Sequence, residues 1–167
     1  YSEPLTFLAL RMVIVAGLLF IASIVTRAPW PNNLSSIRHA AVAGLLVHAG
    51  YLSGVMCALK NGMPVGLIAL ITCLQPILTA LAAGPLFGEK ITQRQWLGLA
   101  LGLVGVGFVV SSKLKTAHAP NLLGMTQTIF ALISITAGTL YQKRHGGNMD
   151  LRTGGVIQYG ACAIVLG

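Results

Sequence analysis

The sequence predicts an all-α membrane protein, a polytopic bundle of transmembrane helices. Hydrophobic residues make up 55% of the chain and charged residues only 8%, and the mean hydropathy is +0.80. Soluble domains contain about 25% charged residues. A soluble fold would leave much of this apolar surface without a core to bury it, so we expect the chain to lie in a lipid bilayer.

Six apolar stretches follow one another along the chain, separated by short polar loops. They cover residues 5–26, 40–59, 65–87, 96–112, 122–141 and 155–167. Because a helix needs about 20 apolar residues to cross the hydrocarbon core, the last stretch is either a truncated span or a short segment. None alternates apolar and polar residues as barrel strands do, so we expect helices throughout.

Local features support individual spans. The first stretch lacks the basic leader of a signal peptide and is too long for a cleaved apolar segment, so it is expected to span. In the third stretch Pro76 removes one backbone hydrogen bond and predicts a kink. The fourth stretch is short, but it begins at Trp96, a residue type that prefers the membrane interface, and Ser111 and Ser112 extend it.

Glycine spacing predicts close helix packing in the fourth stretch. Gly98 and Gly102 form a GxxxG pattern that Gly105 continues, and small residues at this spacing let two helices approach each other. Gly50 and Gly54 repeat the pattern in the second stretch. For that single match, packing and chance remain equally open.

The net charge of +8 arises mainly from basic residues between the apolar stretches. If alternate loops lie on alternate sides, one side collects Arg27, Arg38, Lys90, Arg94, Lys143, Arg144 and Arg152, and the other Lys60, Lys113 and Lys115, with Arg11 inside the first span. The positive-inside bias makes the first side cytoplasmic. These bases form no stripe interleaved with aromatic residues, so we expect no nucleic-acid partner.

The sequence predicts neither an enzyme nor a cofactor or metal site. His48 has no carboxylate partner in its span, and His39, His118 and His145 are isolated in or near loops. The three cysteines, Cys57, Cys73 and Cys162, lie in apolar stretches without metal-ligand or redox spacing. Glu89 and Lys90 are interpreted as a structural pair in a surface turn.

Polar residues inside two spans are candidates for a substrate-binding cavity, because polar groups are costly in a membrane. In the second stretch, His48 and Tyr51 share one helix face. In the third, Thr72, Gln75 and Thr79 form a polar stripe beside the expected kink. The structural alternative is that the threonines bond back to their own helix, Gln75 bridges to a neighbour and the proline only bends the helix.

Arg11 is a further cavity candidate near the start of the first span. It either meets an anionic group of a substrate, pairs with Glu3, or extends its charged end to the membrane surface. The last of these is the ordinary behaviour of a basic side chain near a helix end.

An ordered set of motifs resembles the EamA family of the drug/metabolite transporter superfamily. From residue 51 to 110 the chain carries an ALKNGMPVG turn, a mid-helix proline in LQPILTAL, a GEKIT turn and the run QWLGLALGLVGVG. Further support comes from NLLG at residue 121 and from LYQKR, which ends at residue 144. No single element is specific, and the order of the set carries the resemblance.

The resemblance implies a fragment of a ten-helix transporter built from two inverted five-helix repeats. Residues 1–113 would form the first repeat without its first helix, and residues 120–167 the start of the second, about five and a half helices in all. The implied function is alternating-access transport of small metabolites such as amino acids, in a bacterial inner membrane. A non-transporting scaffold and a small multidrug carrier are the alternatives. The expected partners are a small substrate, lipid and the remainder of the same chain, with the oligomeric state left open.

Overall fold

The computed structural model describes residues 4–31, 33–89, 92–114, 122–146 and 149–166, and their side chains except at 4–5 and 109–114. Its elements are α1 (Pro4–Val25), α2 (Leu34–Gly44), the π-helix η1 (Leu45–Gly50), α3 (Tyr51–Lys60), α4 (Val65–Thr72), α5 (Gln75–Phe87), α6 (Gln93–Leu114), α7 (Leu122–His145) and α8 (Leu151–Leu166). No strand occurs among these residues, and the predicted all-α class is confirmed.

Four helical stretches are long and apolar enough to cross a membrane. They are Thr6–Val25, Leu34–Lys60, Val65–Phe87 and Leu122–His145, and α8 is a shorter apolar helix. Large apolar side chains such as Phe7, Leu18 and Phe130 face outward, as lipid-facing residues do. The chain is therefore a multi-pass membrane protein, as predicted. The expected span at 96–112 falls in α6 and reaches side chains outside the described set, so it stays a prediction.

The second span begins earlier than the apolar pattern predicts and is not a uniform α-helix. The Asn33 side chain accepts a hydrogen bond from the backbone N–H of Ser35 at 3.0 Å, which caps α2 and moves its start from the expected residue 40 to Leu34. Six residues then form η1 before α3 continues the span to Lys60. Short π-helical segments are rare and occur frequently at functional sites.

The third span is interrupted directly before Pro76. α4 ends at Thr72 and α5 begins at Gln75, so two residues separate the helices. Pro76 lies in the first turn of α5, where its missing N–H leaves no intrahelical bond unmade. The break therefore divides the span into two separate helices.

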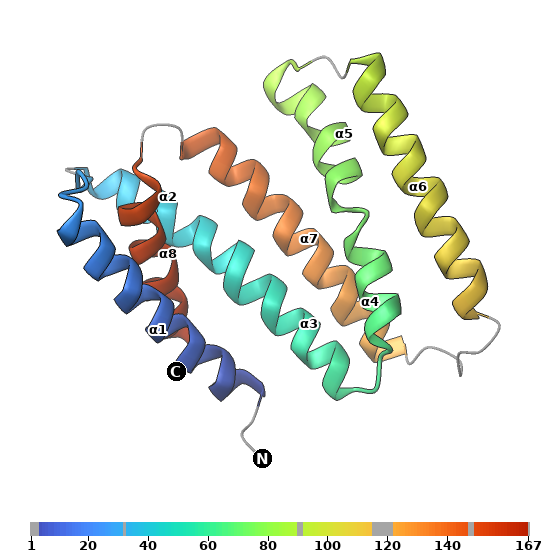
Figure 1. The fold of residues 1–167 in the computed structure, drawn as a ribbon, viewed down its shortest axis with the longest axis horizontal. Coiled ribbons are helices and arrows are strands. Elements are labelled where there is room, and N and C mark those ends of the chain that lie inside the picture. Colours follow the sequence, from blue (N-terminus) through green and yellow to red (C-terminus); the bar gives the residue numbers. More distant parts are fainter. Residues whose placement is uncertain (1–3, 32, 90–91, 115–121, 147–148, 167) are drawn as a thin grey trace.

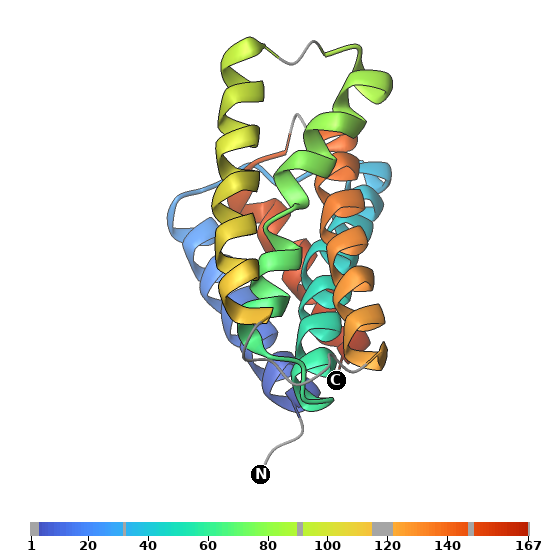
Figure 2. The same ribbon diagram turned by 90° about the vertical axis from the view of Figure 1, so that its right-hand side faces the viewer.

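Helices from the two ends of the sequence pack together. Figure 1 shows α7 between α3 and the α4–α5 pair, while α8 packs on α1 and α2. In Figure 1 α6 stands at one edge of the bundle, where it contacts α4, and in Figure 2 that edge faces the viewer. The C-terminal ends of α1, α5 and α7 lie at one end of the bundle, and the C-terminal ends of α3 and α6 lie at the other (Figure 1). This arrangement agrees with the division of loops that the charge pattern predicts.

The two predicted glycine patterns have different surroundings in the structure. A Cβ added to Gly54 would lie 2.9 Å from Ala131 Cβ, and one added to Gly50 would lie 2.9 Å from Ser134 Oγ. These glycines therefore allow α3 and η1 to approach α7 closely. At Gly98, Gly102 and Gly105 no described atom lies within 4 Å of such a Cβ, so the predicted packing of this α6 face stays a prediction.

Candidate functional site

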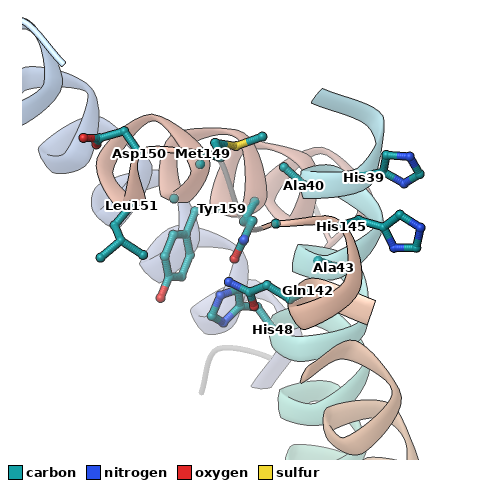
Figure 3. Close-up of a pocket in the computed structure, with 14 residues that line it drawn as sticks. His39, Ala40, Ala43, His48, Gln142, His145, Met149, Asp150, Leu151 and Tyr159 are labelled. Carbon is teal, nitrogen blue, oxygen red and sulfur yellow. The ribbon is translucent and has the colours of Figure 1, made fainter. Parts of the chain in front are cut away.

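A cavity of about 210 Å³ lies between the second span, the C-terminal end of α7 and α8. Its polar lining consists mainly of His39, His48, Gln142, His145, Gln158 and Tyr159, to which Asp150 adds a carboxylate. Figure 3 shows His48, Gln142 and Tyr159 in its middle, with Asp150 on one side and His39 and His145 on the other. Of the predicted binding residues, His48 lines this cavity.

His48 is held in the inner part of the cavity by η1 and α8. Its ring stacks on the ring of Tyr159 with centroids 4.3 Å apart, and Gln158 lines the same cavity. Position 48 lies close to the middle of the span Leu34–Lys60. The cavity therefore reaches from the end of the helices to the centre of the predicted membrane span.

Close packing of α8 on α2 places Gln158 and Tyr159 at this site. A Cβ added to Gly44 would lie only 2.6 Å from the Gln158 Cα, so the two backbones approach as only glycine permits. Beside this contact the thiol of Cys162 donates a hydrogen bond to the carbonyl oxygen of Gly44 at 3.2 Å. The crossing sets the depth at which α8 presents its polar residues to the cavity.

Two histidines expected to be isolated meet at the mouth of the cavity. The rings of His39 on α2 and His145 on α7 are stacked, with centroids 4.2 Å apart and an angle of 16° between planes. His39 Nδ1 is also 2.7 Å from the hydroxyl oxygen of Tyr141. The prediction was wrong because the start of the second span packs on the C-terminal end of α7, a contact between residues 102 positions apart. His118 lies outside the described residues.

A second cavity of about 300 Å³ adjoins the first at the same end of the bundle. It lies between the α1–α2 loop and the α7–α8 connection and shares His145, Met149 and Asp150 with the first cavity. Asp150 begins α8, where its carboxylate accepts a hydrogen bond from the backbone N–H of Arg152 at 2.8 Å. Thr153 ties α8 to the loop through a hydrogen bond to the carbonyl of Pro29 at 3.1 Å.

The polar stripe of the third span makes the contacts of the structural alternative. Gln75 Nε2 lies 3.4 Å from Thr79 Oγ1 and 3.5 Å from Thr139 Oγ1, so it links α5 to α7. The Thr72 hydroxyl donates back to the carbonyls of Ile68 and Ala69 in its own helix. Neither of the two cavities above includes these residues, and their role in substrate binding stays a prediction.

Tyr51 and Arg11 also lie outside the lining of the two cavities. Tyr51 is half-buried at the start of α3, directly after η1. Arg11 is exposed on α1. Glu3, its proposed partner, lies outside the described residues.

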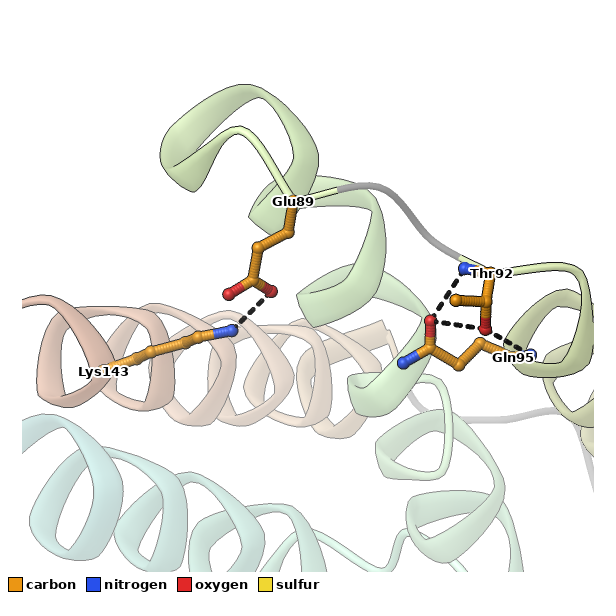
Figure 4. Close-up of polar contacts among 4 residues, drawn as sticks. All are labelled: Glu89, Thr92, Gln95 and Lys143. Carbon is orange, nitrogen blue, oxygen red and sulfur yellow. Dashed lines mark hydrogen bonds and ion pairs between the residues drawn. The ribbon is translucent and has the colours of Figure 1, made fainter.

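Glu89 pairs with a different base from the one expected. Its carboxylate lies 2.6 Å from Lys143 Nζ at the end of α7, and each side chain is about half exposed (Figure 4). Lys143 also lies 5.3 Å from the centre of the Phe87 ring. The α5–α6 turn is thus tied to α7 at the end of the bundle where both cavities lie. Lys90 is outside the described residues.

Sequence reasoning missed most of the cavity because the lining comes from three separate segments. Gln142 and Tyr159 carry no local signal, and His39 and His145 were assigned to loops. The one available signal was that the ends of their helices were predicted to lie on the same side of the membrane. Among the described residues, no group of three or more His, Cys, Asp or Glu side chains is placed to hold a metal ion.

Comparison with known proteins gives consistent matches. The model of the EamA-like transporter family matches residues 1–111. The chain is 28% identical to a probable amino-acid metabolite efflux pump of Salmonella typhimurium over 159 residues, which is 83% of this chain and 53% of the relative. The Escherichia coli protein of the same description is 29% identical over 143 residues, covering 84% of this chain and 44% of the relative.

A further relative is the uncharacterized inner membrane transporter YedA of Escherichia coli, which is 29% identical over 166 residues. That alignment covers 98% of this chain and 51% of YedA. The chain therefore spans about half the length of the curated relatives it matches. No solved structure matches the chain.

Proposed function

We propose, from the premise that this chain belongs to the EamA-like transporter family, that it contributes the binding cavity of a carrier for small amino-acid metabolites. The family match confirms the resemblance drawn from the ordered motifs. The relatives carry the names of pumps and transporters, in agreement with the prediction that the chain is not an enzyme. The name of YedA supports a bacterial inner membrane as its location.

The depth of the cavity is the observation that carries this proposal. Its lining extends from His145, the last residue of α7, to His48 near the middle of the second span. Carriers that work by alternating access hold their substrate near the midplane of the membrane. A cavity that reaches that depth from one end of the bundle has the form of an open access path.

The chemistry of the lining suits a small zwitterion. Among the described lining residues, Asp150 carries the one fixed charge, while Gln142, Gln158 and His48 offer neutral donors and acceptors. The amides and the imidazole can form hydrogen bonds with a carboxylate, and the Asp150 carboxylate can attract an ammonium group. The volume of about 210 Å³ is below the range of about 300 to 1,000 Å³ that drug-sized ligands occupy. We therefore assign amino acids and their small derivatives, a class that the names of the two efflux pumps also suggest.

We further propose that the chain joins parts of two repeats. Residues 1–113 would belong to the first and residues 120–167 to the second. In support, α7 packs on α3 and α8 packs on α1, so the later helices complete the packing of the earlier ones. The cavity lies where helices of both proposed repeats meet, which is where inverted-repeat carriers place their sites.

The test is solute flux through the full-length protein in liposomes. We expect efflux of preloaded radiolabelled amino acids or their derivatives, screened as a panel of about twenty small solutes. In the variant His48→Phe the ring can still stack on Tyr159, but the imidazole nitrogens that can form a hydrogen bond with a substrate are lost. Because one hydrogen bond is worth about 1 kcal/mol, KM should rise about fivefold to tenfold.

The matched control is Gln93→Ala at the exposed start of α6, far along the chain from the cavity. Its KM should equal that of the wild type. Absence of flux for the whole panel, with a correctly inserted and monodisperse protein, would overturn the proposal. Equal KM values for His48→Phe and the wild type would remove this cavity as the binding site.

A further inference from the structure

A cluster of three aromatic side chains joins α2 to α7 at the mouth of the cavity. We define this histidine cluster as His39, Tyr141 and His145. Each ring contacts the other two, with centroid distances of 5.7 Å for His39 and Tyr141, 4.5 Å for Tyr141 and His145, and 4.2 Å for the two histidines. Figure 3 shows the two histidine rings side by side at one edge of the cavity.

The histidine cluster is placed where it can control access. His39 and His145 both line the inner cavity, and His145 also lines the outer one. The histidine cluster joins the second span to the last residue of α7. Separation of the two rings would therefore widen the cavity at its outer end while leaving His48 and Tyr159 in place deeper inside.

Hydrogen bonds limit the protonation states of the cluster. His145 Nδ1 lies 3.2 Å from the carbonyl oxygen of Tyr141, and since a carbonyl only accepts, the nitrogen must carry the hydrogen. His39 Nδ1 and the Tyr141 hydroxyl share one hydrogen bond, which either group can donate. The parallel stack is compatible with two neutral rings or with one charged ring. Two charged rings at 4.2 Å would repel each other.

Most of the charged groups around the histidine cluster are basic. The charged or titratable groups on the packed elements are Arg38 on α2, Lys143 and Arg144 on α7, Asp150 and Arg152 at the start of α8, and His48 and Tyr159 deeper in the cavity. Lys143 is paired with Glu89. Arg38 and Arg144 adjoin His39 and His145 in the sequence, so a cluster with both rings charged would add two positive charges to a basic end of the bundle.

We propose that the histidine cluster is a pH-sensitive gate of the cavity. While at most one of the two rings is in its charged imidazolium form, the stack keeps the start of the second span against α7. When both rings are protonated, their repulsion separates α2 from the end of α7 and opens the mouth. Histidine is the side chain that changes charge between about pH 5 and 8, so acidification on that side opens the gate. The regulatory meaning of this gate rests on the proposed function of the cavity.

The experiment measures access to the cavity with a cysteine reporter in the full-length protein. Ala43→Cys places a thiol on the lining at a position that is 2% exposed. Cys57 and Cys73 are replaced by alanine, and Cys162 remains because it is buried. Labelling by a membrane-impermeant maleimide is timed in inside-out vesicles at about pH 7.5 and about pH 5.5, which brackets histidine titration.

Each rate is divided by that of the same reporter in the His39→Phe/His145→Phe variant, because thiol reactivity itself depends on pH. That variant keeps two flat rings but cannot be charged. We expect the ratio of the labelling rate with both histidines present to the rate in the double phenylalanine variant to be near one at the higher pH. At the lower pH this ratio should be about fivefold to tenfold, because two like charges at this separation repel. His39→Lys/His145→Lys should label rapidly at both pH values.

Arg144→Gln is the matched control, since it removes a charge beside His145 without removing a ring. In this variant the labelling ratio should still rise when the pH is lowered from about 7.5 to about 5.5. The same ratio at both pH values for the wild type, or slow labelling of the double lysine variant, would overturn the gate. Labelling requires no transported solute, so a failure of the gate and a failure of the proposed transport activity give different results.

Discussion

At the scale of single residues, the closest backbone contact of the site depends on Gly44. Any larger residue there would meet the Cα, Cβ and carbonyl oxygen of Gln158, all within 2.9 Å of the added Cβ. Backbone atoms cannot move aside as the end of a flexible side chain can, so α8 itself would have to shift. A methyl group at this position therefore affects both stability and the cavity.

We predict that Gly44→Ala destabilises the protein by about 1 to 3 kcal/mol, which is the usual cost of overpacking a closely packed site. The melting temperature in detergent should fall by several degrees. Gly102→Ala is the matched control, because no described atom lies within 4 Å of a Cβ at that position. Equal melting temperatures for the two variants would contradict the close crossing of α2 and α8.

At the scale of elements, the two unusual helices have different origins. The break of the third span follows from Pro76, which cannot donate a backbone hydrogen bond to the carbonyl of Thr72. The π-helix η1 contains no proline, and its only glycine is its last residue, Gly50. Its sequence, LLVHAG, would suit an α-helix, so the tertiary contacts of η1 with α7 and α8 must select the wider turn.

We predict opposite effects of Pro76→Ala on stability and on transport. A restored N–H can complete one backbone hydrogen bond, worth about 1 kcal/mol, and the melting temperature should rise by a few degrees. Solute flux should fall, because α4 and α5 would join into one helix and no longer move separately. Pro85→Ala, inside α5, is the control and should leave flux unchanged. Undiminished flux in Pro76→Ala would show that the break is not needed for transport.

At the scale of the whole molecule, the C-terminal ends of α1, α5 and α7 gather at the end of the bundle that also holds both cavities, and most of the basic residues adjoin these helix ends in the sequence. The pair Glu89–Lys143 ties two of these helix ends together. A half-exposed ion pair contributes only about 0.2 to 1 kcal/mol, so the helices, rather than this pair, determine the arrangement. The positive-inside bias predicts that the cavities open toward the cytoplasm.

This sidedness predicts opposite labelling of two cysteine variants in intact cells. Arg144→Cys lies at the end with the cavities, and Val65→Cys lies at the exposed start of α4. In a background with Cys57 and Cys73 replaced by alanine and the buried Cys162 retained, a membrane-impermeant maleimide should label position 65 and spare position 144. In inside-out vesicles the pattern should reverse. Labelling of both positions from one side would contradict the predicted topology.

The sequence by itself determined the class of the protein and its apolar stretches, and it predicts which loops lie on which side of the membrane. Apolar length and loop charge are local properties, because the bilayer imposes the same thickness and the same charge bias on every span. Pro76 is likewise local, since its missing N–H acts within its own helix. These features therefore needed no knowledge of which helices are neighbours.

The tertiary structure alone decided which residues form the cavity. His48 meets Tyr159, and His39 meets His145, across more than 100 positions of sequence. Nothing in either local segment specifies the other, because helix pairing in a membrane depends on how closely particular surfaces can approach. Gly44 and the wider turn of η1 allow the second span, α7 and α8 to meet as they do. The site therefore depends on how the helices pack, whereas the fold class depends on the transfer of apolar stretches from water into the bilayer.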